Sequence, residues 1–132
     1  MKKGYLAISY SERKHFDTEV ACLKKMFKED NVELLVFVDK YNFKPNQEKE
    51  MMKTAFNEID HSDFLIAELT TKSIGVGIEI GYAFAKKIPI IYIRKKNAEY
   101  STTASGSSTH IVVYENEFDL EKSMEAIVSK LN

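Results

Sequence analysis

Residues 64–93 read FLIAELTTKSIGVGIEIGYAFAKKIPIIYI, and this stretch decides the fold class. The runs at its two ends, Phe64–Ala67 and Ile88–Ile93, are apolar on both faces, which is typical of strands that helices cover on both sides. The pattern between them predicts a helix over residues 76–87. A buried strand, a helix and a second buried strand together predict a mostly parallel sheet with right-handed crossovers.

The same alternation continues toward both ends of the chain. Strands are expected at residues 4–8, 32–38, 64–69, 89–93 and 110–114, and helices at about 14–29, 46–60, 76–87 and 118–131. This order predicts an α/β fold: a doubly wound, flavodoxin-like sheet of five parallel strands in the order 2-1-3-4-5, with helices on both faces. No linker or internal repeat interrupts the pattern, so residues 1–132 are expected to form a single domain.

The composition limits the kinds of partner. The 132 residues carry 19 basic and 20 acidic side chains, so neither a nucleic-acid polymer nor an anionic membrane is an expected partner. The lone Cys22 excludes an internal disulfide, and the first apolar run is too short for a signal peptide. Both features favour a cytoplasmic protein. The histidines are scattered without metal-ligand spacing, so no metal or other cofactor is expected.

In such a sheet, ligands bind beyond the carboxyl ends of the strands. That rule selects residues 9–13, 39–43, 70–79 and the segment from Arg94 onward. In the third of these, Gly75 and Gly77 let the backbone turn and let a ligand approach. Gly77, Gly81 and Ala85 predict a flat strip that packs close to the sheet. Glu79 is expected near the first turn of the helix, where the helix dipole favours an ionised carboxylate. From spacing alone, Glu79 is either a functional carboxylate or a solvated glutamate at a helix start.

Several other functions lack their motifs. The glycine pattern is G-x-G-x-x-x-G and follows the third strand, which does not fit a dinucleotide-binding fingerprint. The first strand ends without an acidic pair, which argues against a response regulator, and no histidine lies beside a strand-end serine as in a hydrolase triad. Residues 97–109 hold seven Ser/Thr and one glycine, and composition alone predicts a mobile surface loop.

Two segments, SDFLIAELT at residues 62–70 and GVGIEIGYA at residues 75–83, closely resemble the nucleoside 2-deoxyribosyltransferase superfamily. The chain is most similar to its small members, the 2'-deoxynucleoside 5'-phosphate N-hydrolases. The similarity runs from Tyr5 to about Tyr114, and G-x-G-x-E-x-G is its most specific part. The resemblance implies that Glu79 is the nucleophile that attacks the anomeric carbon and displaces the base. Water then completes a hydrolysis, or a second base completes a transfer.

The resemblance also assigns further site residues. Tyr5 matches a tyrosine of the catalytic site, and the matches that bind substrate are Ser9, Ser73, Gly75, Gly77 and Ser101, with Asp39 as a further candidate. The family carries an aspartate at the position of Ser73 when it acts on unphosphorylated nucleosides, so Ser73 implies a nucleotide substrate. Ser101 matches a serine that a neighbouring subunit supplies, which implies a homodimer with shared active sites. The interface is expected on one of two helices, either the one with Tyr82, Phe84 and Lys86 or the one with Met51, Met52 and Phe56.

The chain departs from the family in two places. Ala55 stands where the family has an aspartate that assists the departing base, and Asp39, Glu58 or Asp60 are the candidates to replace it. For the last two, a solvated helix face is the expected environment. The arginine after the first strand, Arg13, is out of register. Three alternatives to the N-hydrolase stay open: a related transferase, a catalytically weak nucleotide-binding protein, which Ala55 favours, and an NAD-cleaving enzyme with a helix glutamate as in Toll/interleukin-receptor-like domains.

Overall fold

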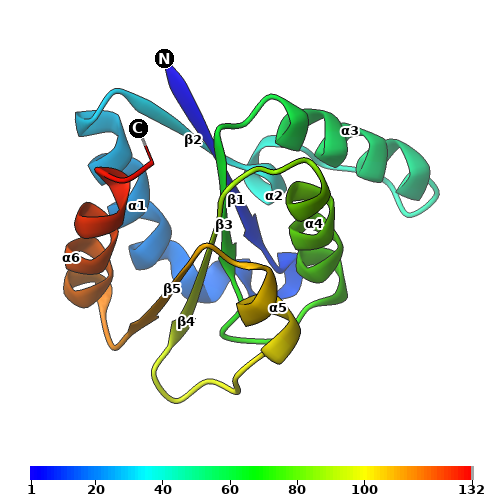
Figure 1. Ribbon diagram of the computed structural model, residues 1–132. Helices are drawn as coiled ribbons and strands as arrows, with labels where there is room; N and C mark the ends of the chain where they lie inside the picture. The colour runs from blue at the N-terminus through cyan, green and yellow to red at the C-terminus, as the bar shows by residue number, and fades with distance from the viewer. Residues whose placement is uncertain (132) are drawn as a thin grey trace.

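The computed structural model of the chain describes residues 1–131, so residue 132, the last of the expected domain, lies outside it (Figure 1). Five parallel strands form one sheet in the order β2-β1-β3-β4-β5, which confirms the predicted fold class and strand order. The strands are β1 Lys2–Ile8, β2 Val32–Val36, β3 Phe64–Glu68, β4 Ile90–Lys95 and β5 His110–Tyr114. The register pairs Tyr5 of β1 with Leu65 of β3.

Helices cover both faces of the sheet, as Figure 1 shows. One face is covered by α1 (Asp17–Glu29) and α6 (Glu117–Val128). The other is covered by α3 (Glu48–Asp60), α4 (Ile74–Ala85) and α5 (Thr102–Ser107). A 3₁₀ helix, η1 (Tyr10–Phe16), follows β1, and a single helical turn, α2 (Phe37–Lys40), follows β2. No helix within residues 1–131 is long and apolar enough to cross a membrane.

Alternate residues of β1 to β4 supply two separate hydrophobic cores, because successive side chains of a strand point to opposite faces. Leu6 and Ile8 of β1 pack with α1 and α6. Tyr5 and Ala7 of the same strand pack with α3 and α4. The second core places Tyr5 beside α4, the helix that carries the glycine-framed Glu79.

Two local expectations were wrong. The second strand ends at Val36 rather than residue 38, because the chain there turns into α2. The supposed surface loop at residues 97–109 contains α5, whose N-cap is Ser101. Ala104 of α5 is buried against the second core, so packing outweighs the polar composition of this segment.

Gly4 is the glycine whose replacement should damage the fold. It pairs with Phe64 in the sheet, and a Cβ atom built on Gly4 would overlap the Phe64 ring. Phe64 is itself buried against Phe27, with ring centroids 5.2 Å apart, so it has little room to move. We expect Gly4→Ala to lower the free energy of unfolding by about 1–3 kcal/mol in urea denaturation, as overpacking does. Gly106→Ala, whose added Cβ meets no atom within 4 Å, is the matched control. Equal stability of the two variants would contradict the close fit.

Candidate active site

The helix α4 sets the direction of Glu79. Ser73 is its N-cap, and the Ser73 hydroxyl accepts a hydrogen bond from the Val76 amide at 3.3 Å. Val76 and Ile80 face the sheet and are buried. Glu79 therefore lies in the second turn of α4, not the first, and on the flank that faces β1.

Glu79 forms a hydrogen-bonded pair with Tyr5. The Tyr5 hydroxyl donates to Oε2 of Glu79, and the Tyr5 ring is 0% exposed. Burial raises the pKa of Glu79 to about 7, while the hydrogen bond from Tyr5 acts in the opposite direction. Burial, followed by the Glu79 charge, also raises the pKa of Tyr5, so Tyr5 stays protonated and remains a donor. The helix dipole was expected to favour the ionised carboxylate of Glu79, whereas desolvation by burial is the largest influence on its pKa and favours the protonated form.

A cleft lies on the opposite flank of α4, between α4 and α5. It has a volume of about 340 Å³. Its lining includes Ser73, Gly77 and Gly81 of α4 together with Ser101, Thr103 and Ser107 at α5. The structure thus brings Ser73 and Ser101 together in one chain. Glu79 and Tyr5 are not part of the lining, so α4 separates the two groups of predicted site residues.

The glycines of α4 keep this cleft open. A Cβ atom at Gly77 or Gly81 would meet no atom within 4 Å, and one at Gly75 would lie 3.9 Å from the Ser73 hydroxyl. None of the described glycines has a positive φ. The predicted tight packing of Gly77 and Gly81 on the sheet was therefore wrong. Their exposed surface borders the cleft instead.

Asp39 and Ser9 have hydrogen-bond partners other than the Tyr5–Glu79 pair. Both oxygens of Asp39 accept hydrogen bonds from the Arg13 guanidinium, each at 2.9 Å. The Ser9 hydroxyl lies 3.1 Å from that of Ser11. Within residues 1–131, neither Asp39 nor Ser9 contacts Glu79 through a hydrogen bond. The ion pair between Asp39 of α2 and Arg13 of η1 instead links these two elements at the carboxyl edge of the sheet.

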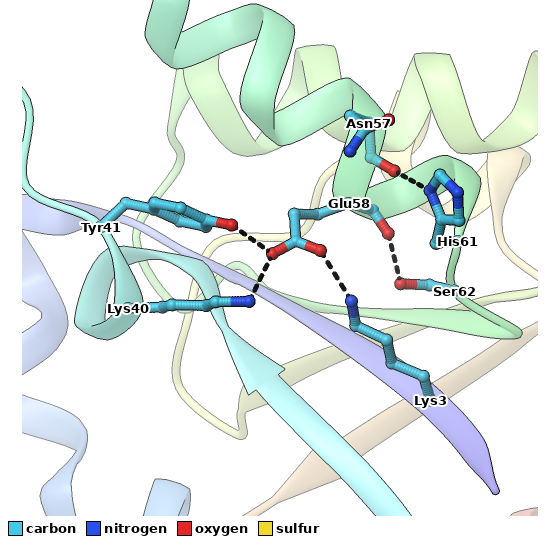
Figure 2. Close-up of polar contacts among 7 residues, drawn as sticks. All are labelled: Lys3, Lys40, Tyr41, Asn57, Glu58, His61 and Ser62. Carbon is cyan, nitrogen blue, oxygen red and sulfur yellow. Dashed lines mark hydrogen bonds and ion pairs between the residues drawn. The ribbon is translucent and has the colours of Figure 1, made fainter.

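The neighbourhood of Ala55 also differs from expectation. Ala55 is 2% exposed and packs in the same core as Tyr5. Figure 2 shows that Glu58, one turn further along α3, accepts hydrogen bonds from Lys3 at 2.7 Å, Lys40 at 2.9 Å and the Tyr41 hydroxyl at 2.7 Å. Burial alone would raise the pKa of Glu58, but these three donors lower it to about 2. A solvated face was the wrong expectation for Glu58, which is 6% exposed and fully engaged with these partners.

Sequence reasoning missed an aromatic group that covers Tyr5. The Phe37 ring lies 6.0 Å from the Tyr5 ring, and Tyr41 and Phe43 pack on Phe37 at 5.0 and 6.1 Å. The signal was present, since three aromatic residues follow β2 within seven positions. From the sequence alone, Asp39 was the candidate in that segment. In addition, no three His, Cys, Asp or Glu side chains among residues 1–131 are arranged to hold a metal ion.

Known proteins provide an independent comparison. Residues 5–126 match the nucleoside 2-deoxyribosyltransferase family. A protein of Methanosarcina mazei with the provisional name 2'-deoxynucleoside 5'-phosphate N-hydrolase 1 is 31% identical over 81 residues, which are 61% of this chain and 50% of that protein. A protein of the same provisional name from Syntrophotalea carbinolica is 46% identical over 46 residues, 35% of this chain and 32% of its own. The matched part of the chain thus covers half or less of the length of each of these relatives.

Two solved structures share the fold. The Clostridium botulinum CMP N-glycosidase superimposes with a TM-score of 0.72 at 22% identity, over 95% of this chain and 98% of its own. The 2-deoxyribosyltransferase of Bacillus psychrosaccharolyticus superimposes with a TM-score of 0.68 at 15% identity, over 90% of each chain. Because the family match covers most of the sequence, the chain belongs to the nucleoside 2-deoxyribosyltransferase family.

Proposed function

We propose that this protein hydrolyses the N-glycosidic bond of a nucleoside 5'-monophosphate, with Glu79 as the nucleophile, and releases the free base and a sugar phosphate. The observation that carries the proposal is the desolvated Glu79 carboxylate held by the buried Tyr5 hydroxyl. A carboxylate whose pKa is strongly perturbed by burial is a frequent mark of a catalytic site.

The chemistry follows from this pair. The Glu79 carboxylate attacks C1' of the sugar, and the C1'–Oε bond forms as the bond from C1' to the base nitrogen breaks. The base leaves with that electron pair and takes a proton from solvent. Water then attacks C1', releases its proton to solvent and returns Glu79 as a carboxylate. Each displacement at C1' passes through an oxocarbenium-like transition state. The hydrogen bond from Tyr5 fixes the orientation of the Glu79 carboxylate in this reaction.

The pH dependence tests the state of Glu79. Only the ionised carboxylate is a nucleophile, and the pKa of Glu79 lies at about 7 rather than its usual value near 4.5. We therefore expect kcat/KM to rise with pH, about tenfold per unit below pH 7, and to level off above it. The measurement is a pH profile of base release between pH 5 and 9, with buffers of constant ionic strength. A profile that is flat from pH 5 to 8 would contradict this assignment.

Ser73 and Ser101 support a phosphorylated substrate. Both serines line the same cleft, and their hydroxyls cap α4 and α5. The first amides of an α-helix have no partner within the helix. Such amides and hydroxyls bind phosphate well. Lys72 also lines the cleft, although its ammonium group pairs with Glu99 at 3.0 Å. We therefore place the 5'-phosphate among these donors.

A homodimer with shared sites is part of the proposal. Ile74 and Phe84 of α4 are 86% and 60% exposed, and Ile78 between them is also exposed. An apolar face of this kind is typical of an interface. Of the side chains expected there, Tyr82 and Phe56 stack on each other at 4.2 Å and join α4 to α3. A partner packed on α4 would bring its α5, with Ser101, toward the Glu79 site.

One assay separates the candidate functions. The purified protein is incubated with nucleoside monophosphates, the matching nucleosides and NAD, and free base is measured by chromatography. Release of base from a monophosphate, but not from the matching nucleoside or from NAD, supports the N-hydrolase. Capture of the sugar by an added free base identifies the transferase. Release of nicotinamide from NAD identifies an NAD-cleaving enzyme. Binding without release from any compound identifies the weak nucleotide-binding protein, which the apolar Ala55 favours.

A further inference from the structure

Glu68, the last residue of β3, is a buried carboxylate that the proposed reaction does not use. It is 4% exposed. Its side chain points to the core formed with α1 and α6, because it continues the alternation of Phe64 and Ile66 on that face. The sheet therefore separates Glu68 from Glu79. Burying a carboxylate costs free energy unless its oxygens are hydrogen-bonded, so the partners of Glu68 indicate what it holds in place.

The hydrogen bonds of Glu68 connect the carboxyl ends of three strands. Oε1 accepts from the Thr70 amide at 2.7 Å. Oε2 accepts from the Thr70 hydroxyl at 2.9 Å and from the hydroxyl of Tyr114, at the end of β5, at 2.7 Å. The Thr70 hydroxyl in turn accepts from the Lys95 amide of β4 at 3.0 Å. One carboxylate thus ties Thr70 to the ends of β3, β4 and β5.

The connection from β3 to α4, residues 69–73, is the segment that this network holds (Figure 1). Leu69 and Ser73 line the cleft beside α4, and Ser73 is also the N-cap of that helix. Thr70 lies between them and is bound to Glu68 through both its amide and its hydroxyl. A displacement of Thr70 would therefore move the cleft lining and the start of α4 together.

Other polar side-chain contacts of this connection with distant parts of the described chain lie in solvent. The Thr71 hydroxyl is 3.5 Å from Glu12, and both residues are exposed. Lys72 pairs with Glu99, and both side chains are more than half exposed. Exposed pairs of this kind contribute little, because solvent screens them. The buried bonds to Glu68 are therefore the contacts best able to fix the connection.

We infer that Glu68 is a positioning residue: from the face of the sheet opposite Glu79 it fixes residues 69–73, and so sets the place of Ser73 for substrate binding. That this placement matters for hydrolysis rests on the proposed function. The order of the connection does not, because it is measurable without substrate. A role in core stability alone would leave the connection and the kinetic constants unchanged.

Amide hydrogen exchange, followed by nuclear magnetic resonance on the full chain, tests whether Glu68 holds the connection. Glu68→Gln replaces an acceptor oxygen with a donor amide. Thr70→Val removes the hydroxyl at nearly equal size, and Thr70→Ser retains it. The reporters are the amides of Val76 and Gly77, which donate to the hydroxyl and carbonyl of Ser73. We expect their exchange to rise about tenfold in Glu68→Gln and Thr70→Val, and to stay near the wild-type rate in Thr70→Ser.

The kinetics of base release test the effect on the substrate. With the monophosphate that the wild type hydrolyses fastest, we expect Glu68→Gln and Thr70→Val to raise KM about tenfold and to change kcat less than about threefold. Thr70→Ser should restore KM. Ile66→Val is the matched control, because Ile66 is buried on the same face of the same strand and has no polar contact with the connection. It should leave KM unchanged even where its melting temperature falls.

Two results would overturn the inference. One is wild-type exchange at the reporter amides in both Glu68→Gln and Thr70→Val. The other is a KM that these two variants leave unchanged, or that Ile66→Val raises equally. If Glu68→Gln does not fold, the comparison of Thr70→Val with Thr70→Ser decides instead. If the wild type releases base from no nucleotide, the proposed function fails, and the exchange rates still decide whether Glu68 fixes the connection.

Discussion

Replacing Glu79 with glutamine should reduce base release by at least about three orders of magnitude, because the amide removes the nucleophile while its oxygen still accepts the Tyr5 hydrogen bond. The wild type and the variant are compared by single-turnover chromatography of the released base. Glu125→Gln is the control, since Glu125 is an exposed glutamate of α6 on the far face of the sheet. A Glu79→Gln rate within tenfold of the wild type would refute the nucleophile assignment.

The same variant should be more stable than the wild type in alkaline solution. In the folded chain the pKa of Glu79 is raised to about 7 from an ordinary 4.5, so the stability that its protonated form confers is lost as pH rises through 7. Glutamine cannot ionise, so we expect its free energy of unfolding to exceed that of the wild type by about 2 kcal/mol at pH 8 and by little at pH 4. Denaturation at the two pH values measures the difference. A loss of activity combined with this gain would separate a catalytic role from a structural one.

The sheet was predictable because its evidence is local. Phe64–Glu68 is buried at every position, and such a run predicts a strand covered on both faces whatever surrounds it. The turn at Phe37–Lys40 was not predictable in this way. Val36 and Phe37 continue an apolar run, yet the chain turns there, and the Tyr41 amide donates to the Phe37 carbonyl at 3.1 Å.

The site was predictable only in part. The glycine-framed position of Glu79 is visible in the motif, but Tyr5 lies 74 residues away, and only the resemblance to a family indicated it. Burial decides the pKa of Glu79, and burial is a property of the assembled core rather than of the motif. Glu58 shows the same limit. Its spacing on α3 fits a solvated face, whereas the contacts with Lys3 and Lys40 come from other elements.

Ala55 affects the expected rate of the proposed reaction, because it stands where the resemblance implies an aspartate that assists the departing base. It is buried in the apolar core around Tyr5, and the nearby Glu58 carboxylate is held by three donors. No carboxylate among residues 1–131 other than Glu79 accepts a hydrogen bond from Tyr5. Under the proposed function, we expect the departing base to take its proton from solvent and the hydrolysis to be slow.

The helix α4 separates Ser101 from Glu79 of the same chain, so the two residues can be tested for action across a dimer. If Ser101 acts on the Glu79 of a partner subunit, two inactive chains should complement each other. Ser101→Asp should lower nucleotide hydrolysis by at least about a hundredfold through repulsion of the phosphate, while the new carboxylate still caps α5. A dimer of one Glu79→Gln chain and one Ser101→Asp chain then contains one site with both wild-type residues.

We expect that hybrid, isolated with two different affinity tags, to recover about half of the wild-type activity, since one of its two symmetric sites is intact. The control pairs a wild-type chain with a chain that carries both substitutions, and a shared site makes this dimer inactive. If each chain instead uses its own Ser101, which lines the cleft with Ser73 in the same chain, the outcomes reverse and only the control retains activity. A chain that forms no hybrid and sediments as a monomer would remove the shared site altogether. The nucleotide would then have to pass over the first turn of α4, where Gly75 and Gly77 leave the surface free of side chains.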